Sequence, residues 1–178
     1  HVRRSVAGLS RTAREQVKAG LVADAAKTIA GARASIAPRG LAERISLWRG
    51  ERAVKRTAFS LADTRSKSGD ITGTRDALDG LATLKDAGRF GVWGQWEVAS
   101  AQGVAFSRAI SRAKATAKYG DIEPALDSHG FAAELRGPAD RKVRATAEKI
   151  LGRSLELAAK QAKAGNSQGA WQALQYGT

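Results

Sequence analysis

The sequence predicts an all-α fold of antiparallel helical hairpins that form a bundle or a short solenoid. Three observations lead to this fold class. Apolar residues recur at helical spacing along most of the chain. A motif of lysine, any residue and glycine returns four times between these segments. No stretch alternates apolar and polar residues with β-branched side chains over a useful length, so we expect no strand.

The repeated motif is predicted to turn the chain at four glycines, Gly20, Gly69, Gly120 and Gly165. Glycine readily adopts the left-handed conformation that ends a helix, and a lysine in the last turn suits the negative end of the helix dipole. Asp70, Asp121 and Asn166 follow three of these glycines and can cap the next helix. Successive glycines lie 49, 51 and 45 residues apart, a period within the range of helical arrays.

The first half of the chain is predicted to hold four helices, over about 5–18, from 21 to the break at Pro38 and Gly40, over 41–67, and from 71 to Gly88. The third of these has a broken apolar stripe. Its first part places Leu41, Ile45 and Trp48 on one face, whereas Val54 and Ala58 lie on a rotated face. Gly50 lies between the two parts and is predicted to mark a kink or a helix boundary.

The second half is predicted to begin with an irregular segment, Gly88 to Trp96, in which three glycines at a spacing of three oppose a helix. Helices are then expected from 96 to the Gly120 corner, over 122–133 and, after Gly137 and Pro138, over 143–163, with a short stub at 166–174. The segment 88–96 carries Phe90, Trp93 and Trp96. These aromatic residues either point outward, as a contact for a partner protein or a stacking platform for bases, or, in the interpretation we favour, fold inward onto an alanine-rich core.

The second helix of each predicted hairpin resembles that of tetratricopeptide-like repeats. The resemblance lies in small and large residues at fixed offsets after each corner glycine: Ala25, Ile29 and Ala32; Thr74, Leu78 and Leu81; Ala125, His129 and Ala132; Ala170, Leu174 and Gly177. Pro38 and Pro138 also lie near the place of the proline in such repeats. The period is longer than the family's 34 residues. The resemblance implies a scaffold that binds another protein, and it assigns no functional residue.

Charge is the most informative property of the composition. The chain of 178 residues carries a net charge of +13, and residues 1–60 contribute +9 of it. The candidate binding residues in this basic first third are Arg3, Arg4, Arg11, Arg14, Lys18 and Lys27. Such a surface fits an anionic partner, namely an acidic protein, a nucleic acid or a lipid surface, or it serves only to keep the protein soluble. We expect the whole chain, 1–178, to form a single domain.

The ends of the sequence bear on its localisation. The sequence has no methionine and begins at His1, which indicates a processed or trimmed N-terminus. Its arginine-rich, acid-free start is also similar to the end of an organellar transit peptide. Export, an organelle and the cytoplasm all remain compatible with these features. No apolar run approaches the length of a membrane span.

The sequence contains few of the residues that enzymes use for catalysis. Cysteine is absent and the only histidines are His1 and His129, which excludes a zinc site and a Cys/His nucleophile. Asp127, Ser128 and His129 adjoin on one predicted helix, so they point in different directions. We expect no catalytic residue, no cofactor and no metal.

The leading hypothesis is a non-enzymatic binding or assembly protein that docks onto a larger, acidic partner. The alternative is sequence-nonspecific nucleic-acid binding through the basic first third.

Overall fold

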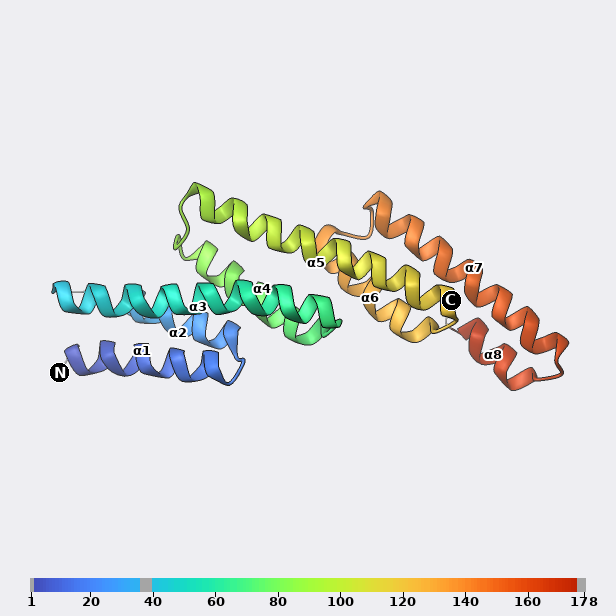
Figure 1. Cartoon of the computed structure of the whole chain (residues 1–178), viewed down its shortest axis with the longest axis horizontal. Coiled ribbons are helices and arrows are strands. Elements are labelled where there is room, and N and C mark those ends of the chain that lie inside the picture. Colours follow the sequence, from blue (N-terminus) through green and yellow to red (C-terminus); the bar gives the residue numbers. More distant parts are fainter. Residues whose placement is uncertain (1, 36–39, 176–178) are drawn as a thin grey trace. The chain divides into compact units, whose positions relative to one another are not determined.

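The computed structural model describes the backbone of residues 2–35 and 40–175 and the side chains of residues 6–34 and 40–175. These residues form eight α-helices and no strand, which confirms the all-α fold class (Figure 1). The helices are α1 (Val2–Lys18), α2 (Val22–Ser35), α3 (Leu41–Ser68), α4 (Ile71–Asp86), α5 (Val92–Tyr119), α6 (Ile122–Arg136), α7 (Arg141–Lys163) and α8 (Ser167–Gln175).

The chain divides into two compact units, His1–Gly103 and Val104–Thr178, which we call unit 1 and unit 2 and describe separately. That residues 1–178 form one domain therefore stays a prediction. Pro38 and Gly177 lie outside the described residues. Arg3 and Arg4 belong to α1, but their side chains lie outside the described part of the chain.

The four predicted glycine corners are confirmed. Each corner glycine has a positive φ, between 75° and 91°. At every corner the residue after the glycine donates its backbone N–H to the carbonyl five residues earlier, from Leu21 to Gln16, Asp70 to Arg65, Asp121 to Thr116 and Asn166 to Gln161, at 2.9–3.0 Å. This is the Schellman geometry, in which glycine avoids the steric cost that a side chain would bring to the left-handed conformation. The sequence thus fixes where each hairpin turns.

Unit 1 stacks its hairpins in two layers. Helix α1 packs against α2 and α3, while α4 packs against α2 and α3. Val6 on α1 shares a buried cluster with Leu47 on α3, and Ser10, one turn later, lies beside Gly50, one turn beyond Leu47, so α1 and α3 run parallel (Figure 1). One layer therefore holds α1 and α3 and the other holds α2 and α4.

Glycine and alanine bring the helices of unit 1 close together. Helix α3 is a single helix through Gly50, so the predicted helix boundary there is wrong. Gly50 is buried, and a Cβ atom added to it would lie 3.0 Å from Cδ1 of Ile29 and 3.7 Å from Oγ of Ser10. The glycine therefore allows α1 and α2 to approach α3 closely.

Unit 2 repeats the parallel arrangement. Ile150 on α7 packs with Ala113 and Ala117 of α5 in one buried cluster. The guanidinium of Arg153 donates to the carbonyl of Lys118 at 3.1 Å, so α5 and α7 run side by side in the same direction. Helix α8 has no buried residue and is tied to α7 by the hydroxyl of Ser154, which donates to the carbonyl of Ala173.

Candidate partner-binding surface

The outer face of α1 is basic, as the sequence predicts. Arg11, Arg14 and Lys18 are exposed and recur on the side of α1 opposite the buried Val6 and Ala13. Within the described residues, no carboxylate pairs with these three cations. Lys27 on α2 is also exposed, but its ammonium lies 3.8 Å from the carboxylate of Asp24. The charges of α1 are therefore free to meet an anion, whereas that of Lys27 is partly compensated.

Helix α3 adds a second basic surface that the sequence interpretation missed. Its exposed face carries four arginines and one tryptophan, which we call the α3 face: Arg44, Trp48, Arg49, Arg52 and Arg56. The guanidinium of Arg52 lies 5.2 Å from the centre of the Trp48 ring, a cation–π contact. No carboxylate of the described residues pairs with any of these arginines.

The signal for the α3 face was present in the sequence. Leu41, Ile45 and Trp48 share a sector of the helical wheel with Arg52, and a core-facing stripe would not hold so strong a charge. The structure leaves these three apolar side chains 75%, 40% and 53% exposed, respectively. The break in the apolar stripe therefore separates an exposed sector from the buried one that contains Val54 and Ala58.

The basic faces of α1 and α3 lie at the same level of unit 1. Ser10 contacts Ser46, and it is also the neighbour that an added Cβ at Gly50 would meet. Because α1 and α3 run parallel, Arg14, one turn beyond Ser10, lies level with the middle of the α3 face. Figure 1 shows the two helices side by side with α2 behind them.

The segment 88–96 is only partly as expected. It is irregular as far as Gly91, but α5 begins at Val92, so the prediction that Trp93 and Trp96 lie in a loop is wrong. Phe90 is 9% exposed and packs edge-on against Phe59, with 6.3 Å between ring centres. Trp93 and Trp96 are 83% and 67% exposed. The inward interpretation therefore holds for Phe90 and is wrong for both tryptophans.

An ion-pair network around the buried Glu51 contacts Phe90. Glu51 on α3 is nearly buried and accepts from Arg33 at 2.8 Å and from Lys55 at 2.7 Å. The ammonium of Lys55 also lies 4.3 Å from the centre of the Phe90 ring and donates to the carbonyl of Arg89. This network fixes the segment that precedes α5, so the two exposed tryptophans stand on the first turns of an anchored helix.

Trp171 on α8 is 64% exposed, so all four tryptophans of the chain present their rings to solvent. Tryptophan is on average a well-buried residue, and exposed tryptophan together with arginine is typical of the residues that dominate binding energy in protein interfaces. The two chemical types lie on the same helix at the α3 face.

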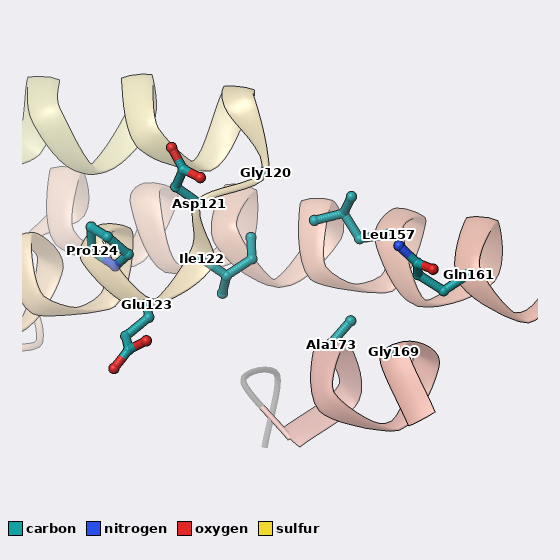
Figure 2. A pocket seen from close by; sticks show the side chains of 9 residues that line it. All are labelled: Gly120, Asp121, Ile122, Glu123, Pro124, Leu157, Gln161, Gly169 and Ala173. Carbon is teal, nitrogen blue, oxygen red and sulfur yellow. The ribbon is translucent and has the colours of Figure 1, made fainter. Parts of the chain in front are cut away.

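Unit 2 contains a pocket of about 360 Å³ between the α5–α6 corner, α7 and α8 (Figure 2). Ile122 and Leu157 supply apolar side chains to it. In Figure 2 the carboxylates of Asp121 and Glu123 point to different sides, so they do not converge on one ligand atom. Acid–base catalysis needs such convergence.

Two residues considered for catalysis, Ser128 and His129, are buried or contact a neighbouring helix. Ser128 is buried, and Nε2 of His129 lies 3.2 Å from the carbonyl oxygen of Val143, which ties α6 to α7. Within the described residues no group of three or more His, Asp or Glu side chains could hold a metal ion. No helix in the described part of the chain is long and apolar enough to cross a membrane.

Positions that carry the tetratricopeptide-like resemblance lie in the core of unit 1, since Ala25, Ile29, Thr74 and Leu81 are buried. Membership in that family stays a prediction. Comparisons of the chain with protein-family models, curated proteins and solved structures give no match.

Proposed function

We propose that the protein is a non-enzymatic binding or assembly protein that docks onto a larger, acidic partner through unit 1. The observation that carries this proposal is the α3 face, where Arg52 lies over the exposed ring of Trp48 among three further arginines without a carboxylate partner. Arginine and tryptophan are enriched among the residues that dominate binding energy. A continuous helix presents them with little loss of backbone freedom.

Charge supports an acidic partner. The basic face of α1 lies level with the α3 face, and the two together carry seven exposed cations: Arg11, Arg14, Lys18, Arg44, Arg49, Arg52 and Arg56. A patch of one sign steers an oppositely charged surface toward it and raises the association rate. Trp93 and Trp96 supply a further apolar contact on the same unit.

A second candidate function is sequence-nonspecific nucleic-acid binding. The pairing of Trp48 with Arg52 favours it, because single strands stack their bases on aromatic rings while cations track the phosphates. No base-reading motif accompanies these residues, so such binding would be unspecific in sequence.

The test compares two double variants of the full chain that remove the same charge from unit 1. Arg44→Ala/Arg52→Ala removes the centre of the α3 face, whereas Lys67→Ala/Lys85→Ala removes two exposed cations elsewhere. We expect a stoichiometric acidic protein to co-purify with the wild-type chain and with the lysine variant, and to be lost with the arginine variant and with Trp48→Ala. Filter retention of random RNA that falls steeply with added salt and is lost with Arg44→Ala/Arg52→Ala, with no co-purifying protein, would instead support the second function.

A further inference from the structure

Unit 2 contains a groove between α5 and α7, with a volume of about 680 Å³, that is lined by cations. Lys114 and Lys118 line it from α5, and Lys149 and Arg153 line it from α7. All four side chains are exposed. We call this feature the cationic groove; its volume falls in the range of ligand-binding pockets.

The cations of the groove stand at two levels. Arg153 donates to the carbonyl of Lys118, so these residues face each other across the groove. Lys114 and Lys149 each lie four residues earlier on the two parallel helices, and they therefore form the next level, about 6 Å along the helix axis. Each wall thus offers one positive group per helical turn.

Two further residues define the groove. Glu156 is its one acidic lining residue and pairs with Arg153, so it offsets part of the positive charge. Gly152 lies on the α7 wall, and a Cβ atom added there would meet nothing within 4 Å. The glycine keeps the groove wide where a side chain would project into it.

We infer that the cationic groove binds the phosphate backbone of a single-stranded nucleic acid. Two cations on each wall, one helical turn apart, match a ligand whose charge repeats along its length. Three of the four cations are lysines, whose ammonium groups act as point charges and bind phosphate oxygens in many orientations, which suits contacts to a backbone that carries no sequence information. No aromatic side chain lines the groove, so it holds the backbone and the bases remain outside.

This inference concerns a different unit and a different ligand from the proposed docking through the α3 face, so the two are tested separately. The full chain contains no cysteine. A Tyr119→Cys substitution therefore provides one labelling site for an environment-sensitive dye, beside Lys118 at a position that is 80% exposed in the wild type. Titration with a short oligothymidylate then reports binding at the groove rather than at unit 1.

We expect Lys114→Ala/Lys149→Ala to weaken binding about tenfold and to lower the slope of log K against log salt by about 1.4, or 0.7 for each lost phosphate contact. The matched control is Arg141→Ala/Arg144→Ala, which removes two exposed cations of α7 outside the groove and leaves affinity within about twofold. Glu156→Gln removes the opposing charge and tightens binding. Gly152→Phe keeps every charge but narrows the groove, and weakens binding.

Several outcomes overturn the inference. Equal weakening by both double variants would show a diffuse charge effect, and an unchanged affinity in Gly152→Phe would show that the groove itself is not occupied. Binding of inorganic triphosphate without binding of the oligonucleotide, or equal binding of polyglutamate at the same ionic strength, would assign the groove to another anion. Arg44→Ala/Arg52→Ala should leave the titration unchanged, which separates failure here from failure of the docking proposal.

Discussion

The carboxylate of Asp76 on α4 accepts a hydrogen bond from the backbone N–H of Val22, the first residue of α2, at 2.9 Å. Its other oxygen accepts from the N–H of Ala23 at 3.3 Å. Leu21 precedes α2 and has no side chain that could cap it, unlike Asp70 before α4, which accepts from the N–H of Gly73. The second hairpin thus supplies the cap that the first hairpin lacks.

The Asp76→Ala variant should therefore lower the free energy of unfolding by about 1–2 kcal/mol, the usual cost of a lost helix cap. The matched control is Asp79→Ala on the same helix, because Asp79 is exposed and the change should stay within about 0.5 kcal/mol. Urea denaturation followed by circular dichroism measures both. Equal stability of the two variants would show that Asp76 does not cap α2.

Gly80 tests the close approach of α4 to α2. A Cβ atom added to Gly80 would lie 2.8 Å from Cγ1 and 3.0 Å from the carbonyl oxygen of Val22. Gly80→Ala should therefore destabilise the protein by about 1–3 kcal/mol through overpacking. Gly31→Ala, at a helical position with nothing within 4 Å, should instead stabilise it by about 0.5–1 kcal/mol. Thermal unfolding of the two variants should shift in opposite directions.

Phe90 is predicted to contribute far more to stability than its neighbouring aromatic residues. It packs on Phe59 and under the ammonium of Lys55, so Phe90→Ala should cost about 3 kcal/mol. Trp93→Ala and Trp96→Ala should each change stability by less than about 0.5 kcal/mol, because their rings are exposed. Chemical denaturation of the three variants gives the comparison. A similar loss in all three would show that the tryptophans also belong to the core.

The exposure of the tryptophans has a direct spectroscopic consequence. Trp48, Trp93, Trp96 and Trp171 are between 53% and 83% exposed. Acrylamide should therefore quench most of the fluorescence of the isolated protein, with a slope close to that measured in urea, and the emission should be red-shifted. A blue-shifted emission with weak quenching would contradict this placement. Addition of the docking partner should protect the signal, and Trp48→Ala should reduce that protection.

The sequence by itself determined where the four corners lie and most of the helical segments, although it placed the first turn of α5 in an irregular segment. The corner glycines end their helices through their own backbone conformation. The hydrogen bonds that close each corner join residues near in sequence, as when the N–H of Asp70 donates to the carbonyl of Arg65. Local steric and hydrogen-bond rules act within a few residues, so they can be read from the order of residues.

The tertiary structure decided which apolar and charged side chains face solvent. Gly50 is a point of close contact within α3 and not a helix boundary, since Ile29 from another helix lies against it. Phe90 is buried because Phe59 and Lys55 pack against it, whereas Trp48 is exposed. Both are large aromatic residues, so residue type alone does not tell which of the two is buried. The cationic groove combines residues from two helices, and the placement of α5 beside α7 depends on long-range packing, which local periodicity does not specify.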